Sequence, residues 1–406
     1  MSSGLARGQR AFAIAVAATS WFGCAGFREE LRAGNALPGS ADERSTVPRD
    51  PSRVAFDMRF RIQLQAAGEG AYVPLERAPV ALDPINGRIY AATNRGEFFA
   101  YAADGTRMYR RSFGDAIDAG IAVDPVRDRV YVGTSRGRVH ELSGATGEPI
   151  WTVDAGQPLT GSPVLTDDTL FVVADSDVVL ALSREDGTVL WSYRRPPTEE
   201  ITITGHAGLA LHGDALLAAF NDGMVAGIRA SDGSVLWEID TSVDLEASST
   251  GLPRMRDVDT TPVVVGGSIF VASFAAGIYQ LDANNGTVLH RDETWTGVTA
   301  ILGLPNGDLF VASADRGLAR IDPIAHTVAW SRPLDRGAPT GATYEPDTQS
   351  ILFGESRGSL IAVRAESGDE VARFESGYGF GAPATAADGV VAALSNTATL
   401  FVFVAR

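Results

Sequence analysis

The sequence predicts an all-β protein, an eight-bladed β-propeller, from three observations: a repeat of about 40 residues, a large ring side chain at a fixed place in most repeats, and abundant turn residues. The 406-residue chain contains 44 glycines and 20 prolines, spread without a collagen-like period. Such a distribution is typical of many short strands joined by turns. With 45% hydrophobic residues, the chain also has enough apolar side chains for a large core.

Each repeat contains a turn that precedes a strand of alternating apolar residues. Consecutive turns are separated by 41, 40, 46, 54, 40, 41 and 41 residues. The eight turns are Arg95-Gly96-Glu97, Arg136-Gly137-Arg138, Ser176-Asp177-Val178, Asp222-Gly223-Met224, Ala276-Gly277-Ile278, Arg316-Gly317-Leu318, Arg357-Gly358-Ser359 and the degenerate Ala398-Thr399-Leu400. A period near 40 residues with about four short strands per unit is typical of propeller blades.

A second signal repeats in phase with the first, because a tight turn is followed four residues later by a large ring. The pairs are Gly105 with Tyr109, Gly147 with Trp151, Gly187 with Trp191, Gly233 with Trp237, and His326 with Trp330. One unit departs from the pattern, since Gly286 is followed by His290. The fixed phase indicates a structural role, and we expect these rings to pack between adjacent blades.

The last repeat, Ala382 to Arg406, ends after its third strand. The segment from Phe56 to Leu64 alternates apolar with polar residues and precedes the first full blade. We therefore expect this N-terminal segment to complete the last blade as its outer strand. Joining the two chain ends in this way closes the ring and removes an open sheet edge. On this basis residues 54–406 form the propeller.

The first 23 residues are expected to be an export signal. Arg7 and Arg10 precede a short apolar stretch, Ala11 to Phe22, which is too short to span a membrane stably. Residues 24–53 are a mixture of Gly, Pro, Ser, Asp and Arg without a sustained apolar period. That composition predicts a flexible tether.

Cys24 is the only cysteine of the chain and directly follows Trp21-Phe22-Gly23. The segment resembles a lipobox, in which the cysteine is lipidated and becomes the mature N-terminus, although Trp21 stands where lipoproteins usually carry Leu. The resemblance implies that Cys24 anchors the protein to the periplasmic side of the cell outer membrane, because Ala25 is not Asp. The alternative is an ordinary cleaved signal with an incidental cysteine. A secreted chain with one cysteine has no internal disulfide to form, which favours the anchor.

Several function classes have no support in the sequence. The net charge of −16, without any Lys/Arg run, argues against nucleic-acid binding. There is no phosphate-binding loop and no Gly-x-Ser-x-Gly elbow, so we expect no catalytic residues. The five histidines are scattered and have no paired ligand, so they predict no metal site: His140, His206, His212, His290 and His326. Most of them are expected at the surface or at edges.

The repeats resemble the blades of pyrroloquinoline-quinone dehydrogenases, which are also eight-bladed. Those enzymes are longer and typically carry adjacent cysteines near the quinone, together with a bound calcium. Cys24 cannot supply such a pair. We therefore expect no cofactor, and a quinone-binding or dehydrogenase-like propeller stays as the alternative to a binding protein.

The two longest intervals flank the fourth blade and add the stretches Arg194 to Thr204 and Thr241 to Asp257. Both join the outer strand of one blade to the inner strand of the next, so the repeat places them on the same face. Adjacent long loops on one face of a rigid ring indicate a recognition site. Drift of tolerated loops is the alternative.

The second stretch ends in the run Asp257-Val258-Asp259-Thr260-Thr261-Pro262-Val263-Val264-Val265, which is similar to a signature of the BamB family. Ile203-Thr204-Gly205-His206-Ala207 and Ser231-Asp232-Gly233-Ser234-Val235-Leu236-Trp237 also resemble parts of that family, and the resemblance extends from about Phe56 to Arg406. Members of the family are scaffold lipoproteins of the outer-membrane β-barrel assembly machinery.

The BamB resemblance implies a non-enzymatic scaffold that is a monomer within a larger complex. Its partners would be the periplasmic domains of the BamA insertase, as well as unfolded outer-membrane proteins. The family's partner-binding residues correspond to Ile201, Ile203, Asp257 and Asp259. The isoleucines alternate on one side of a strand-like segment, which suits apolar anchors. Burial under their own loop is the alternative for the isoleucines, and holding a turn is the alternative for the aspartates.

One position departs from the family pattern. Thr204 stands where the family usually has an arginine, so a charged contact is lost or moved to the neighbouring Arg256.

Overall fold

The computed structural model describes residues 55–65, 75–196, 207–242, 256–334 and 336–406. The chain divides into two compact units, Met1–Arg44 and Ser45–Arg406, and every described residue belongs to the second. Cys24 and the expected tether over residues 24–53 lie outside the described residues. The described part contains strands β1 to β32 and no helix.

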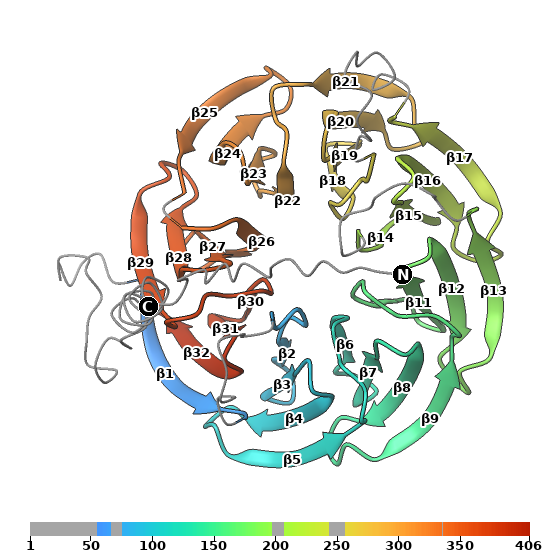
Figure 1. Cartoon of the computed structure of the whole chain (residues 1–406), viewed down its shortest axis with the longest axis vertical. Helices are drawn as coiled ribbons and strands as arrows, with labels where there is room; N and C mark the ends of the chain where they lie inside the picture. The colour runs from blue at the N-terminus through green and yellow to red at the C-terminus, as the bar shows by residue number, and fades with distance from the viewer. Residues whose placement is uncertain (1–54, 66–74, 197–206, 243–255, 335) are drawn as a thin grey trace, which may run out of the picture. The chain divides into compact units, whose positions relative to one another are not determined.

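The prediction of an eight-bladed β-propeller is confirmed. The strands form eight four-stranded antiparallel sheets, each ordered along the chain from the inner to the outer strand, and the sheets stand as blades around a ring (Figure 1). Blade 8 is the exception in order, because its outer strand is β1.

The first four blades account for residues 81–240. Blade 1 contains β2 (Ala81–Asp83), β3 (Arg88–Ala92), β4 (Glu97–Ala102) and β5 (Arg107–Ser112). Blade 2 contains β6 (Ile121–Asp124), β7 (Arg129–Gly133), β8 (Arg138–Ser143) and β9 (Pro149–Asp154). Blade 3 contains β10 (Val164–Leu165), β11 (Thr169–Ala174), β12 (Val178–Ser183) and β13 (Val189–Arg194). Blade 4 contains β14 (Ala210–His212), β15 (Ala215–Ala219), β16 (Met224–Arg229) and β17 (Val235–Asp240).

The remaining blades complete the ring. Blade 5 contains β18 (Val263–Val265), β19 (Ser268–Ser273), β20 (Gly277–Asp282) and β21 (Val288–Asp292). Blade 6 contains β22 (Val298–Gly303), β23 (Leu309–Ser313), β24 (Gly317–Asp322) and β25 (Thr327–Arg332). Blade 7 contains β26 (Pro339–Glu345), β27 (Ser350–Glu355), β28 (Ser359–Arg364) and β29 (Glu370–Glu375). Blade 8 contains β30 (Thr385–Ala387), β31 (Val390–Leu394), β32 (Thr399–Ala405) and β1 (Phe56–Gln63).

The expected closure of the ring by the N-terminal segment is confirmed. Strand β1 pairs antiparallel with β32, from Phe56 opposite Ala405 to Gln63 opposite Thr399. The two chain ends are thus held in one sheet, which leaves β32 no free edge.

The core lies between the blades rather than in one central mass. Eight hydrophobic clusters, one at each contact between neighbouring blades, contain the buried side chains. The middle strands are accordingly almost wholly buried, as in β15 and β27. Each blade therefore depends on both of its neighbours to bury its apolar faces.

The ring side chains of the outer strands pack between blades, as predicted. The Trp151 ring lies against Gly187 of the next blade, where an added Cβ would be 2.8 Å from the indole. Its Nε1 donates a hydrogen bond to the Arg184 carbonyl, at 3.3 Å. Trp191 and Trp330 make the equivalent bonds to carbonyls of the following blade, at 3.0 and 3.1 Å. These glycines also adopt positive φ, +75° at Gly187, a conformation that favours glycine.

The contact between blades 8 and 1 follows the same rule with a ring that the repeat analysis did not single out. Phe60 of β1 lies against Gly105 of blade 1, where an added Cβ would be 3.1 Å from the ring. The closing strand therefore supplies both hydrogen bonds to β32 and the ring that docks on the first blade.

The contact between blades 5 and 6 breaks the rule on both sides. His290 occupies the ring position and His326 the glycine position, and their rings stack with centroids 3.7 Å apart. His326 keeps the backbone of the glycine that it replaces, with φ +54°. At this contact, a pair of stacked histidines replaces the aromatic ring packed on a glycine that other contacts use.

His140 is an exception to the expectation that most histidines lie at the surface or at edges. His140 is buried, at 6% exposure, because its ring packs on Phe113 with centroids 4.4 Å apart. Its Nδ1 lies 2.9 Å from the Thr152 hydroxyl. Burial lowers the pKa of His140 to about 4. His206 lies outside the described residues.

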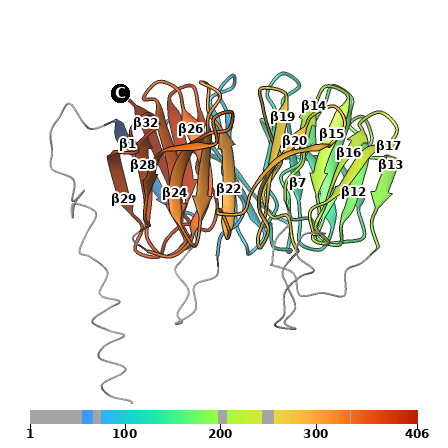
Figure 2. The same cartoon turned by 90° about the horizontal axis from the view of Figure 1, so that it is seen from above.

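The ring has two distinct faces (Figure 2). The hairpin turns between first and second strands, and between third and fourth strands, lie on one face, which we call the hairpin face. The turns between second and third strands and the connections from blade to blade lie on the other, the connection face. This follows from the inner-to-outer strand order of blades 1 to 7.

Candidate functional site

The two long connections beside blade 4 both begin and end on the connection face. Strand β13 ends at Arg194 and β14 begins at Ala210, whereas β17 ends at Asp240 and β18 begins at Val263. The outer strands run in the same direction, so the prediction that both connections share a face agrees with the topology. Ile201 and Ile203 lie outside the described residues, as does Thr204.

The signature run begins with a segment that attaches the second connection to blades 4 and 5. The Asp257 carbonyl accepts a hydrogen bond from the Phe274 amide, at 3.0 Å. Val258 forms an isolated bridge with Ser273, and its amide donates to the Phe220 carbonyl at 3.2 Å. Backbone atoms of the run therefore join the second strand of blade 5 to the end of the second strand of blade 4.

The two aspartates of the signature have different surroundings. Asp257 is fully buried, with 0% exposure, whereas Asp259 is partly exposed. A carboxylate taken out of water is retained when it is paired or hydrogen-bonded within the protein. In this conformation Asp259 is the member of the pair that a partner can reach.

The threonines of the signature have a structural role that the sequence did not reveal. The Thr260 hydroxyl accepts a hydrogen bond from the Ala272 amide at 2.7 Å, within blade 5. The Thr261 hydroxyl accepts one from the Gly208 amide at 2.9 Å. Gly208 lies at the end of the first long connection and Thr261 at the end of the second. This bond therefore ties the two connections together where they meet the blades.

Arg195 fixes the start of the first connection. Its Nε lies 2.6 Å from the Asp222 carboxylate, and its Nη1 lies 3.2 Å from the Glu238 carboxylate. The guanidinium also lies 5.7 Å from the centre of the Phe220 ring. Because Asp222 and Glu238 belong to blade 4, the first connection leaves blade 3 already fastened to its neighbour.

Burial affects the titration of this cluster. It raises the pKa of Tyr193 to about 12, an effect that the hydrogen bond with Glu238 reinforces. Tyr193 donates its hydroxyl proton to that carboxylate while Arg195 donates to the tyrosine oxygen at 3.0 Å. The phenol therefore stays neutral and acts as a bridge between the arginine and the glutamate.

Two features are absent from the residues that the structure describes. Across the described ranges, no group of three or more His, Cys, Asp or Glu side chains is arranged to hold a metal ion. In the same residues no helix is long and apolar enough to cross a membrane. What the described residues offer is the bases of two long connections, joined by the bond between Gly208 and Thr261 on one face of the ring.

Comparison with known proteins identifies relatives of the chain. A family model described as "Outer membrane protein assembly factor BamB" matches residues 86–332. The BamB of Yersinia pestis is 23% identical over 255 residues, which cover 62% of this chain and 63% of that protein. The BamB of Escherichia coli K12 is 24% identical over 314 residues, covering 65% and 79%. The match thus spans less than two thirds of the Yersinia relative.

Solved structures share the fold. BamB from Moraxella catarrhalis superposes with a TM-score of 0.72 and 19% identity, over 86% of this chain and 99% of that one. A quinohemoprotein alcohol dehydrogenase from Comamonas testosteroni superposes with a TM-score of 0.66 and 13% identity, over 86% and 76%. At these identities the structural likeness concerns the propeller itself.

Proposed function

Since this chain belongs to the family of the outer membrane protein assembly factor BamB, we propose that it is a non-enzymatic scaffold of the outer-membrane β-barrel assembly machinery. It binds the periplasmic domains of a BamA-like insertase and assists the insertion of outer-membrane proteins. The observation that carries the proposal is the family match over residues 86–332, which includes the signature from Asp257 to Val265.

The partner binds the connection face beside blade 4. Ile201 and Ile203 supply apolar anchors in the first long connection, and Asp259 supplies a charge at the base of the second. The bond between Thr261 and Gly208 supports this arrangement, because it holds the ends of both connections in a fixed relation. Asp257 positions the signature from inside the fold, in keeping with its 0% exposure.

The protein acts at the periplasmic side of the outer membrane, where Cys24 carries the lipid anchor. Quinone chemistry is not part of this function. A chain whose single cysteine is Cys24 lacks the adjacent cysteine pair of the quinone dehydrogenases that its repeats resemble. Purified protein mixed with pyrroloquinoline quinone and calcium should show no saturable absorbance change, whereas stoichiometric tight binding would contradict this assignment.

The direct test is binding of the purified protein to the periplasmic domains of the insertase from the same organism. Ile203→Asp should lower the affinity at least about tenfold, because loss of a central apolar anchor costs on the order of 2 kcal/mol. Asp259→Ala should weaken binding and leave the melting temperature unchanged. Intact binding by Ile203→Asp would refute the assigned surface.

A control must put the same charge on the opposite face. Gln349→Ala is unsuitable, since Gln349 has φ +52° and alanine there would itself perturb stability. Ile324→Asp is better matched, because Ile324 is 88% exposed in a turn of the hairpin face. It should change neither the affinity for the insertase nor the melting temperature.

A further inference from the structure

A buried glutamate interrupts the repeat in blade 2. On the third strand of four blades, a small residue stands opposite the ring position of the fourth strand: Ala100, Ala181, Gly227 and Ala362. Blades 5 and 6 carry the polar residues Gln280 and Arg320 there. In blade 2 the same place is taken by Glu141, which pairs with Trp151. An alanine would satisfy the fold there, so the carboxylate needs another explanation.

Glu141 is only 3% exposed, and one of its two carboxylate oxygens accepts no hydrogen bond from the described residues. Its Oε1 lies 3.1 Å from the Arg129 Nε and 3.4 Å from the Tyr131 hydroxyl. Within the described chain, the buried Oε2 has no hydrogen-bond partner. Burial raises the pKa of Glu141, against the opposing effect of Arg129. An unsatisfied buried carboxylate oxygen is costly, and a matching donor removes that cost.

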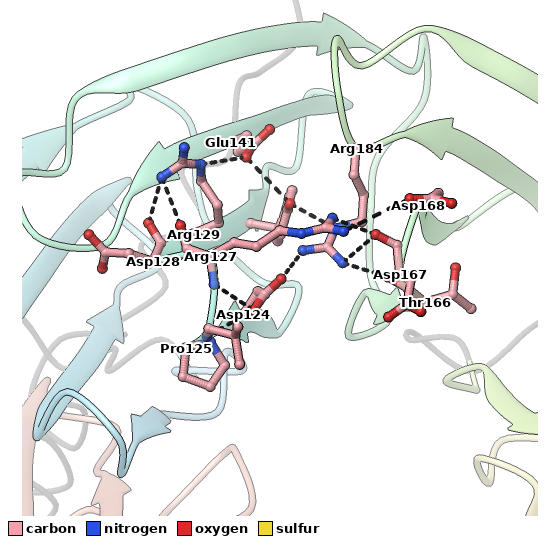
Figure 3. A network of polar contacts seen from close by, with 12 residues as sticks. Asp124, Pro125, Arg127, Asp128, Arg129, Glu141, Thr166, Asp167, Asp168 and Arg184 are labelled. Atoms are coloured by element: carbon pink, nitrogen blue, oxygen red, sulfur yellow. Dashed lines mark hydrogen bonds and ion pairs between the residues drawn. The ribbon is translucent and has the colours of Figure 1, made fainter.

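Glu141 lines a cavity of about 590 Å³ between blades 2 and 3, within the size range of ligand pockets. The cavity opens on the hairpin face, opposite the two long connections. Figure 3 shows Glu141 beside Arg129, with Arg184 reaching across from blade 3. The lining residues are Arg127, Arg129, Tyr131, Glu141, Ile150, Asp168, Ser183, Arg184 and Glu185.

The arginine that spans the cavity is already engaged. Arg184 is paired with Asp124 and donates to the Tyr131 hydroxyl at 2.9 Å, and its side chain is 5% exposed. It also donates to the carbonyls of Thr166 and Asp167, at 2.5 and 3.1 Å. Its charge and its donors are therefore satisfied within the protein.

The mouth of the cavity carries an excess of negative charge. Asp124 offsets Arg184 and Glu141 offsets Arg129, which leaves Arg127 facing the carboxylates of Asp168 and Glu185. The Asp168 side chain is 94% exposed and lies 3.9 Å from Arg127. Ile150, exposed at 46%, adds an apolar lip.

Two other carboxylates of the described chain, Asp115 and Glu370, hold two guanidinium groups each. Asp115 pairs with Arg136 at 3.1 Å and also with Arg138. Glu370 pairs with Arg332 at 2.6 Å and with Arg373 at 2.8 Å. Among these three carboxylates, Glu141 alone has one guanidinium partner and one unused oxygen.

We propose that the cavity between blades 2 and 3 binds an arginine side chain of a partner protein, whose guanidinium is the second partner of Glu141. The terminal torsion of a glutamate is soft, so a small rotation presents an oxygen to the cavity. The methylene stem of the incoming arginine packs on Ile150, and the exposed carboxylates attract its charge. This site is independent of the proposed insertase contact, because it lies on the opposite face.

The probe is the blocked peptide acetyl-Gly-Arg-Gly-amide, added to the full chain. Binding is followed through the indole N–H resonance of Trp151, whose Nε1 donates to the Arg184 carbonyl at the cavity wall. We expect a saturable shift with a dissociation constant near about 1 mM, as suits a single anchor. The matched neutral peptide, with citrulline in place of arginine, should bind at least about tenfold more weakly.

Two variants connect the binding to the carboxylate. Glu141→Ala introduces the residue that other blades carry at this place and should fold normally, and Glu141→Gln keeps the shape without the charge. Both should weaken the arginine peptide at least about tenfold. Arg320→Ala changes the same repeat position in blade 6, opposite Trp330, and should leave binding unchanged. Equal binding of the two peptides, full binding by Glu141→Ala, or no saturable shift would each overturn the proposal.

Discussion

Phe60→Ala should weaken the closure of the ring, because Phe60 is the ring of β1 that packs on blade 1. Phe60 is partly buried and lies against Gly105 of blade 1, where a Cβ would be 3.1 Å from its ring. Replacing a fully buried phenylalanine by alanine costs about 3–5 kcal/mol. Because Phe60 keeps some exposure, we expect Phe60→Ala to lower the free energy of unfolding by about 2 kcal/mol.

The assay separates local opening from global stability. Urea unfolding gives the total loss, and hydrogen exchange reports the amides of β1 and β32 individually. A loss of about 2 kcal/mol corresponds to about 30-fold faster exchange in these two strands. Met58→Ala is the control, since Met58 lies on the same strand with 46% exposure and should cost less than about 0.5 kcal/mol. If both variants lose the same stability, Phe60 does not act as the closing ring.

Four further predictions concern the titration of two buried groups, the contact between blades 5 and 6, and the lipid anchor. Burial lowers the pKa of His140 to about 4 from 6.5, so the unfolded chain takes up a proton at higher pH than the folded chain does. Stability therefore falls as pH drops through this range. In urea unfolding, His140→Gln should remove that loss of stability. Burial raises the pKa of Glu76 to about 7 from 4.5, so the folded chain retains a proton that the unfolded chain releases. Stability therefore falls as pH rises through that range, and Glu76→Gln should remove this pH dependence. An unchanged pH dependence of stability in either variant would contradict the assignment. The double variant His290→Trp/His326→Gly restores a ring on a glycine and should raise stability by about 1 kcal/mol, whereas His290→Trp alone should lower it, as calorimetry can show. Cys24→Ala should abolish lipid attachment and release the protein from the outer membrane fraction, and a wild-type protein that is already unmodified and soluble would disprove the anchor.

The repeat was sufficient to predict the architecture because each blade carries the same local signals. Turn glycines, the ring four residues after a turn, and the alternating segment from Phe56 all depend on short stretches of sequence. Even the degenerate last turn was placed correctly, and Ala398 there adopts φ +55°. These features need no knowledge of which blades are neighbours.

Contacts between blades were harder to predict, since their partners are distant in sequence. The Thr261 hydroxyl bonds an amide 53 residues away, and no spacing rule identifies that pair. The burial of His140 could not be predicted, because nothing local shows that Phe113 covers it. The surroundings of Glu141 depend on a cavity between blades 2 and 3, which no local sequence pattern indicates. The site residues Ile201 and Ile203 stay predictions, because they lie outside the described residues.

The pairing of β1 with β32 determines the order in which the molecule can be completed. Asp57 is bonded to Arg406, which follows it by 349 residues. An exported chain emerges from its N-terminus, so the first strand is available before its partner strand, which holds nearly the last residues. In that interval blades 1 to 7 can form from neighbouring hairpins, but β1 keeps an unpaired edge, and Phe56, which packs between blades 7 and 8, stays uncovered. A nascent chain of this kind therefore benefits from protection of its first strand until its last residues emerge.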